Sequence, residues 1–306
     1  MPTLPEELVA AIDGVSGGPY PARRAAHAKG SFCEGSFTAT PRAAELSRAA
    51  HLSGEPVPVT VRFSNGSGNP ELPDNERVDG RGMAVKFQLP DGEETDSVTI
   101  TIPVFFVRTP EDFLEFTRAR KPDPETGQPD MERLGALIGE HPEIGEAVQL
   151  ILPTLTPPVS YATCGYNSLH AFCLVDPADE RTWVRLRWEP EAGEQVLPEE
   201  EIDSQGPDYL QDELGERLER EPIRFKLLAV VGEQGDPLDD PTQPWPQERE
   251  RVELGTLELT GLTEREEPIV FDPNNLVDGI EPSEDQILAA RSPAYSVSIE
   301  RRMQPR

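Results

Sequence analysis

Short segments that alternate between apolar and polar residues constrain the fold of this chain more than any other feature. Residues 57–63 (VPVTVRF) place three valines and Phe63 on one face of an extended strand. Residues 83–89 (MAVKFQL) repeat the alternation and run into residues 90–92 (PDG), which are typical of a hairpin turn. We therefore expect neighbouring antiparallel strands in this part of the chain.

Later segments extend both the strand pattern and the helical pattern. Further strands are expected at 97–102 and 104–107, in a hairpin of 168–175 and 182–188 that turns at 176–179, and at 223–231 and 252–259. Residues 152–167 are expected to be irregular. Capping residues and helical periodicity predict helices at 4–13, 113–120, 208–219 and 282–291, and one or two helices over 131–151 with a break near His141-Pro142.

The order of these elements indicates the fold class. Many antiparallel strands come first, and helices are inserted between them and appended after them, which predicts an α+β fold built on a closed or nearly closed antiparallel β-barrel. The acidic loops are too short to indicate a second domain. We expect one domain over residues 1–306, with residues 1–20 as an N-terminal arm.

Charge and cysteine content exclude several classes of protein. Asp and Glu outnumber Lys and Arg by 57 to 28, which gives a formal net charge of −29. Nucleic acids and anionic membranes need a basic surface, so we expect neither as a partner. Three cysteines without a CxxC pair predict no disulfide framework and no zinc site. No signal peptide and no long apolar run are present, so we expect a cytoplasmic protein.

The four histidines differ in their surroundings. His51 follows a run of alanines beside Ser-Gly and is predicted to lie on the surface. His141 precedes a proline at the expected helix break, and His170 lies in an apolar strand (SLHAFCLV), where a structural histidine bonded within the core is expected. His27 lies in RRAAHAKG, after two arginines. Taken alone, this histidine is more often structural than catalytic, and both interpretations stay open.

A tyrosine near the C-terminal end is a candidate metal ligand. If the helix over 282–291 continues, Arg291 and Tyr295 are four residues apart and share a face. An arginine beside a phenol stabilises the phenolate, and tyrosinate is an established axial ligand of haem. The alternative is a surface Arg–Tyr pair. The HExxH and P-loop motifs of other enzyme classes are absent from the sequence.

Five segments, in order along nearly the whole chain, resemble the catalase family. They are RRAAHAKGSFCEGSF; VTVRFSNGSG followed by GRGMAVKF; IPVFFVRTPEDFLEF; LHAFCLVD followed by RTWVRLRWEP; and FDPNNLVDGIEPSEDQILAARSPAY. The last of these is long and specific. It ends at Tyr295, which the resemblance makes the iron ligand.

The resemblance implies a catalase-like barrel that holds heme b. It makes His27 the distal acid–base residue, with Ser64 as its hydrogen-bond partner, and Tyr295 the metal ligand. The arginines become partners of the haem propionates, or of the tyrosinate in one case, and the phenylalanines become haem or channel contacts. The implied haem-binding residues are Arg24, Arg62, Phe105, Phe113, Arg291, Tyr295 and Arg302.

Two departures from the family pattern bear on the reaction. The distal asparagine, which helps to place the second peroxide in true catalases, falls at Ile100 in this chain. Few residues follow the expected iron-ligand helix, which is typical of the small catalase-related haem peroxidases. The resemblance therefore implies a peroxidase, active in the oxidative stress response, that reduces hydrogen peroxide or organic hydroperoxides with a small organic reductant.

Three other functions remain open from the sequence. One is dismutation of hydrogen peroxide, as in full-length catalases. Another is rearrangement of a fatty-acid hydroperoxide, although the threonine and asparagine that accompany that activity are not evident. A third, of another class, is a haem-binding or haem-sensing protein without turnover, which would not need His27 as a base. We expect a monomer or a small homo-oligomer.

Overall fold

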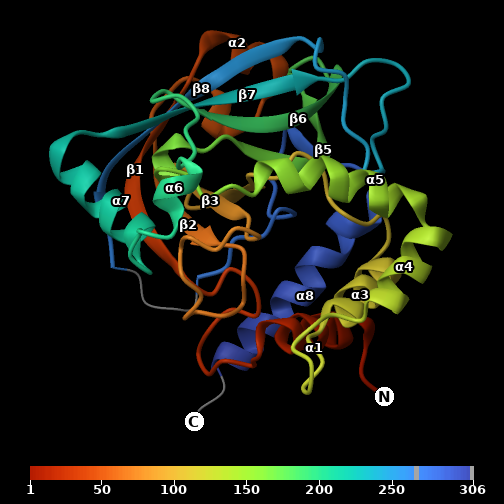
Figure 1. The fold of residues 1–306 in the computed structure, drawn as a ribbon. Coiled ribbons are helices and arrows are strands. Elements are labelled where there is room, and N and C mark those ends of the chain that lie inside the picture. The colour runs from red at the N-terminus through yellow and green to blue at the C-terminus, as the bar shows by residue number, and fades with distance from the viewer. Residues whose placement is uncertain (265–268, 304–306) are drawn as a thin grey trace.

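The computed structural model describes residues 1–264 and 269–303, and its centre is a β-barrel (Figure 1). Within these residues, nine strands form one antiparallel sheet in the order β4-β3-β2-β1-β8-β7-β6-β5-β9. Their bounds are β1 Gly30–Ala39, β2 Val57–Asn65, β3 Arg81–Gln88, β4 Glu94–Ile100, β5 Tyr166–Val175, β6 Arg181–Pro190, β7 Ile223–Val231, β8 Arg251–Leu262 and β9 Ile280–Pro282.

A pairing between the two ends of this sheet closes the barrel. Ile100 of β4 lies opposite Asn167 of β5, so the first eight strands form a ring and β9 adds to the outside of β5. The predicted α+β fold with an antiparallel barrel is confirmed. Joining the end strands of a sheet reduces its exposed edges, which protects an antiparallel sheet from pairing with other chains.

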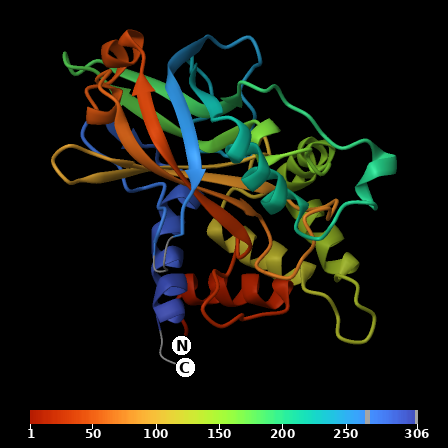
Figure 2. The same ribbon diagram turned by 90° about the vertical axis from the view of Figure 1, so that its left-hand side faces the viewer.

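The longer helices lie outside the barrel. Figures 1 and 2 show α8 leading away from the barrel, with α1 lying against its far end and α3 beside both; each of these three helices contacts the other two. The helices are α1 Leu4–Ser16, α2 Pro41–Leu46, α3 Pro110–Arg120, α4 Met131–Glu140, α5 Pro142–Ile151, α6 Glu199–Ile202, α7 Tyr209–Arg220 and α8 Gln286–Met303, with short 3-10 turns at Ala50–Leu52, Leu152–Thr154 and Tyr161–Thr163. No helix in the described part of the chain is both long and apolar enough to cross a bilayer.

Strand β2 shows how the alternating pattern positions side chains. Val61 and Phe63 are fully buried inside the barrel, as their alternation predicts. The residues between and after them, Arg62 and Ser64, are buried as well, at 6% and 4% exposure, although they point to the other face. The end of β2 is therefore covered on both sides, and its polar residues face a second enclosed space outside the barrel.

The structure corrects three local predictions. Residues 104–107 were expected to form a strand, but they follow β4 as irregular chain that leads to α3. Strand β1 was not predicted; its sequence is rich in Gly and Ser, and at Gly35 a Cβ atom would lie 2.0 Å from the carbonyl oxygen of Glu258 in β8. The C-terminal helix was expected to end at 291, but α8 extends to Met303 with Pro293 in its interior.

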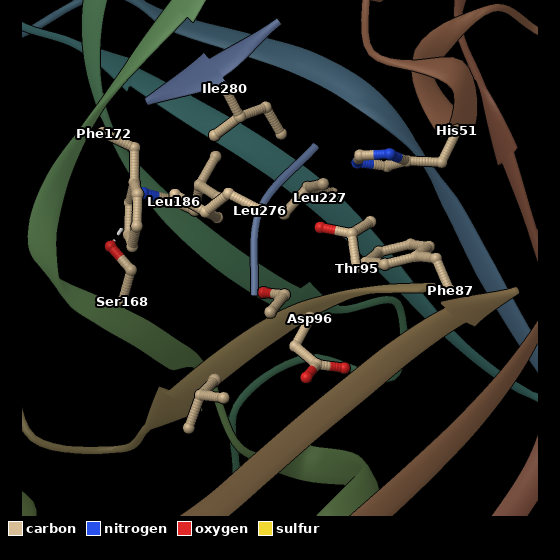
Figure 3. A pocket seen from close by; sticks show the side chains of 12 residues that line it. His51, Phe87, Thr95, Asp96, Ser168, Phe172, Leu186, Leu227, Leu276 and Ile280 are labelled. Carbon is tan, nitrogen blue, oxygen red and sulfur yellow. Dashed lines mark hydrogen bonds between the residues drawn. The ribbon is translucent and has the colours of Figure 1, made fainter. Parts of the chain in front are cut away.

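The predicted surface location of His51 is wrong. This residue lies in a 3-10 turn that plugs one end of the barrel, and its side chain is buried, with the ring centroid 4.5 Å from that of Phe87. Figure 3 shows both rings beside a small cavity in the barrel interior. The cavity measures about 30 Å³, space for about one water molecule.

Burial of His51 makes acid stability testable. Burial lowers the pKa of His51 from 6.5 to about 4. Between these two pH values, His51 is protonated in the unfolded chain and neutral in the folded protein. Folding stability should therefore fall as pH drops through this window, by on the order of 3 kcal/mol from this group. His51→Phe should remove that part of the loss. Urea unfolding of both proteins at several pH values would measure it, and parallel curves for the two would contradict it.

Candidate active site

A cavity of about 640 Å³ lies between the lower rim of the barrel and helices α1, α3, α5 and α8. Its size is within the range of pockets that enclose small-molecule ligands and cofactors. All nine residues singled out from the sequence line it, although they come from segments spread over most of the chain: Arg24, His27, Arg62, Ser64, Phe105, Phe113, Arg291, Tyr295 and Arg302.

His27 lies on the barrel side of this cavity, in the irregular segment between α1 and β1. Its backbone has φ 56°, a left-handed conformation that is uncommon outside glycine, and its amide donates to the carbonyl of Gly66 at 3.0 Å. The imidazole Nδ1 lies 3.0 Å from Ser64 Oγ, which the end of β2 supplies. The ring also packs closely on Gly82 of β3, where a Cβ atom would lie 2.8 Å from it.

The electrostatic surroundings keep the imidazole of His27 neutral. The pKa of His27 is lowered from 6.5 to about 3, first by burial and then by the positive charges of Arg62, Arg291 and Arg24, in that order of effect. The side chain is enclosed by protein but keeps accessible surface within the cavity. A neutral imidazole at neutral pH can accept a proton from a molecule bound there.

Helix α8 brings Tyr295 and Arg291 to the same cavity. The helix continues across Pro293, so the two residues lie one turn apart. Arg291 donates to Tyr295 Oη from Nη2 at 2.6 Å and from Nε at 3.1 Å. This paired contact puts a charged guanidinium within hydrogen-bond distance of the phenol oxygen. The predicted pairing of these residues is confirmed, and it is a cavity feature, not a surface pair.

Arg291 is held in place by His170 and Asp285, two residues that were not predicted to be functional from the sequence. The Nε2 atom of His170 lies 3.2 Å from Arg291 Nη1, and its Nδ1 atom lies 2.6 Å from Asp285 Oδ2. Because Arg291 can only donate, Nε2 of His170 accepts, and Nδ1–H donates to the carboxylate of Asp285. Burial, the largest effect, lowers the pKa of His170, which agrees with this neutral form.

A local irregularity of β5 aims His170 at Arg291. Leu169 has φ 65°, and the pairing of β5 with β6 shifts between Asn167 and Ala171. Such bulges redirect side chains near functional sites. His170 is 1% exposed, so the expectation of a histidine bonded within the core is met. Its contact with the Arg291–Tyr295 pair goes beyond that expectation, and the only sequence signal was a histidine inside an apolar strand.

Arginines surround the cavity on several sides. Arg24 Nη2 donates to the carbonyl of Ile269 at 2.8 Å, and Arg62 lies over the ring of Phe32 with its Cζ 5.6 Å from the centroid. Arg302 comes from the last described turn of α8 and faces the same space. Arginine suits the binding of carboxylates, which its planar guanidinium can contact through two parallel hydrogen bonds.

The remaining wall is apolar and aromatic. The rings of Phe105 and Phe113 are stacked with centroids 5.9 Å apart, and Phe106 packs against both. Ile100 also lines the cavity, and none of the described lining residues is an asparagine. In residues 1–264 and 269–303 no group of three or more His, Cys, Asp or Glu side chains could hold a metal ion. Tyr295 is the candidate metal ligand among the residues that line the cavity.

A closed antiparallel barrel with helices packed on its outside is the architecture on which this cavity is built. Solved structures share this architecture: a fungal catalase matches with a TM-score of 0.81 and 25% sequence identity over 92% of this chain. The family model for catalase matches residues 21–306, and the chain therefore belongs to the catalase family. It spans 60% of the length of that fungal catalase.

Two curated relatives of similar length match almost the whole of this chain. A catalase-related peroxidase from Mycolicibacterium paratuberculosis is 40% identical over 97% of this chain and 94% of its own length. A catalase-related peroxidase from Synechococcus elongatus is 37% identical over 97% of this chain and 88% of its own length. The catalase of Pseudomonas aeruginosa is 32% identical, but this chain covers only 56% of it.

Proposed function

We propose that the protein is a haem-dependent peroxidase that reduces hydrogen peroxide or organic hydroperoxides with a small organic reductant. The observation that carries this proposal is the presence, in one cavity, of a neutral histidine bonded to Ser64 and a tyrosine bonded to an arginine. The extended likeness to two catalase-related peroxidases of similar length supports it. The activity is that of an oxidoreductase acting on peroxide.

The cavity fits a haem, and heme b is the form that we propose. Its volume of about 640 Å³ lies within the range for large cofactors, and its apolar wall suits a flat aromatic macrocycle. Tyr295 offers an anionic oxygen of a kind known as an axial haem ligand. Arg24, Arg62 and Arg302 offer positive charge for propionates. When bound, the haem supplies the redox chemistry that the side chains themselves lack.

The protein's own residues then bind, orient and move protons. If Nδ1–H of His27 donates to Ser64 Oγ, then Nε2 keeps its lone pair and can take a proton from a peroxide and return it to the leaving oxygen. Arg291 donates hydrogen bonds to Tyr295 Oη and orients it, while His170 and Asp285 hold Arg291 in place. Phe105 and Phe113 exclude water from the space around the reacting molecule.

Ile100 favours the peroxidase reaction over dismutation. Dismutation needs a second peroxide to be placed beside the first, and an amide side chain can do so by hydrogen bonding. The isoleucine at this position offers no hydrogen-bonding group. We also propose a cytoplasmic location, one domain with residues 1–20 as its arm, a monomer or small homo-oligomer, a role in the oxidative stress response, and no nucleic-acid or membrane partner.

An absorption spectrum and two turnover assays test the proposal. The purified protein is supplied with haem, and then with hydrogen peroxide or an organic hydroperoxide, with and without an organic donor. We expect a spectrum typical of ferric haem with a tyrosinate ligand, and donor oxidation much faster than oxygen release. Fast oxygen release without a donor would replace peroxidase by catalase as the function. Absence of haem uptake would overturn both.

Close packing of His27 on the barrel gives a prediction about Gly82. In Gly82→Ala the new Cβ would meet the imidazole at 2.8 Å and Ser64 Oγ at 2.9 Å, so the ring must move. Small displacements of a reacting group cost up to about a hundredfold in rate, and we expect kcat/KM for peroxide to fall roughly tenfold to a hundredfold. Gly139→Ala, where a Cβ atom would lie in open space outside the cavity, is the control. Equal rates for both variants would contradict the prediction.

A further inference from the structure

Helix α8 contains a proline between its two functional residues. Pro293 has no N–H to donate to the carbonyl of Ala289, and its ring pushes against that carbonyl. Proline is the commonest cause of a sharp bend in a helix. Arg291 lies before this break and Tyr295 after it, yet the two side chains meet with a hydrogen bond of 2.6 Å. The course of the helix across Pro293 therefore decides whether they meet.

A loop that precedes α8 forms hydrogen bonds with the helical turn just before Pro293. Asn274 Nδ2 donates to the carbonyl oxygen of Leu288 at 2.8 Å and to Ser292 Oγ at 2.9 Å. Ser292 Oγ in turn donates to Asp272 Oδ1 at 2.8 Å. The backbone amide of Asn274 donates to the same carboxylate oxygen at 2.9 Å. Two side chains of the loop thus bind the helical turn that leads into Pro293.

The loop is itself anchored to the barrel wall. The amide of Asp272 donates to Asp96 Oδ2 at 2.9 Å, and Asp96 Oδ1 pairs with Lys86 Nζ at 2.8 Å. The charged side chains of Lys86 and Asp96, from β3 and β4, are 7% and 1% exposed. A continuous set of hydrogen bonds therefore joins two barrel strands to the middle of α8.

We propose that Asn274 and Asp272 are positioning residues, which clamp α8 across the break at Pro293 and so fix how Tyr295 faces the cavity. The role inferred here rests on the proposed function of Tyr295. Other contacts hold the two ends of the helix: Asp285 accepts from the amides of its first turn, and Arg301 pairs with Asp13 of α1 at 2.5 Å. The clamp supplies the fixed point between these ends.

A set of four proteins tests the clamp without relying on turnover: wild type, Asn274→Ala, Pro293→Ala and the double variant. Pro293→Ala restores an N–H for the carbonyl of Ala289, so a helix with this change no longer needs the clamp. In the haem-free proteins, we expect Asn274→Ala to speed amide exchange in residues 294–303 by about tenfold, since a hydrogen-bonded restraint of ordinary strength is lost. We expect the double variant to exchange about as slowly as wild type.

A matched control separates positioning from general stability. Asn75 donates from its side chain to the carbonyl of Ile202 at 2.9 Å and is not among the described partners of α8 or of the clamp, so Asn75→Ala should lower the melting temperature and leave α8 exchange unchanged. With haem bound, Asn274→Ala should shift the absorption bands that report the tyrosinate ligand, and Asn75→Ala should not. Wild-type exchange in Asn274→Ala, or no rescue by Pro293→Ala, would overturn the clamp. If the wild type takes up no haem, the proposed function fails while the exchange data still decide the clamp.

Discussion

Tyr295→Phe should deprive the protein of its haem. The change removes one oxygen and leaves the ring packing intact, so the fold should persist. It takes away the proposed axial ligand and also the acceptor of two hydrogen bonds from Arg291, at 2.6 and 3.1 Å. Hydrogen bonds to charged groups contribute about 1.5–3 kcal/mol each. We expect haem affinity to fall by at least about a hundredfold, and the spectrum of any bound haem to lose its tyrosinate character.

Titration of the haem-free proteins with haem, followed by absorption, measures this loss. Tyr209→Phe is the matched control, because Tyr209 donates to the carbonyl of Pro158 at 2.6 Å and does not line the cavity. It should bind haem as wild type does. Unchanged affinity and an unchanged spectrum in Tyr295→Phe would remove Tyr295 from the site and, with it, the main support for haem binding.

The strands and helices that the sequence predicts are those whose pattern reflects one buried face. In strands β2 and β3, apolar residues occupy every second position because those side chains fill the barrel. The hairpin of β5 and β6 turns at 176–179, as expected. The break between α4 and α5 also falls at His141-Pro142, where proline ends a helix. Such local rules need no knowledge of distant partners.

Other elements depend on distant partners, which no local pattern shows. Strand β1 has small residues because the backbone of β8 approaches within contact distance of Gly35. Helix α8 continues beyond 291 because Asn274 and the Arg301–Asp13 pair hold it, which compensates for Pro293. His51 is buried because its turn closes the end of the barrel, a placement fixed only by the closed sheet.

The candidate site likewise has residues that the sequence predicts and residues that only the fold reveals. The residues themselves made His27, Arg291 and Tyr295 candidates, resemblance named the other six, and the fold places all nine around one cavity. The support behind Arg291 was missed because His170 and Asp285 are 115 positions apart and meet only through the bulge at Leu169. Asp285 also caps the first turn of α8, so one carboxylate both starts the helix and fixes the tautomer of His170.

His27 should govern the rate of peroxide reduction but not the binding of haem. Its imidazole is neutral above about pH 3, so it is available as a base across the physiological range. General acid–base catalysis by one side chain contributes about a hundredfold to ten-thousandfold in rate. We expect His27→Ala to keep its haem and to lose kcat/KM for peroxide by that factor, whereas a haem-binding protein without turnover would show no such loss.

The left-handed backbone at this residue calls for a second variant. Alanine is poorly suited to φ 56°, so His27→Ala could also loosen the segment between α1 and β1. Asparagine tolerates this conformation and cannot act as a base, so His27→Asn should show the same loss of rate with an undisturbed fold. His141→Ala, at a half-exposed histidine outside the cavity, is the control. Stopped-flow measurement of the reaction with peroxide decides the matter: wild-type rates in His27→Asn would show that the proton moves without this side chain, and the proposed role of the distal histidine would be wrong.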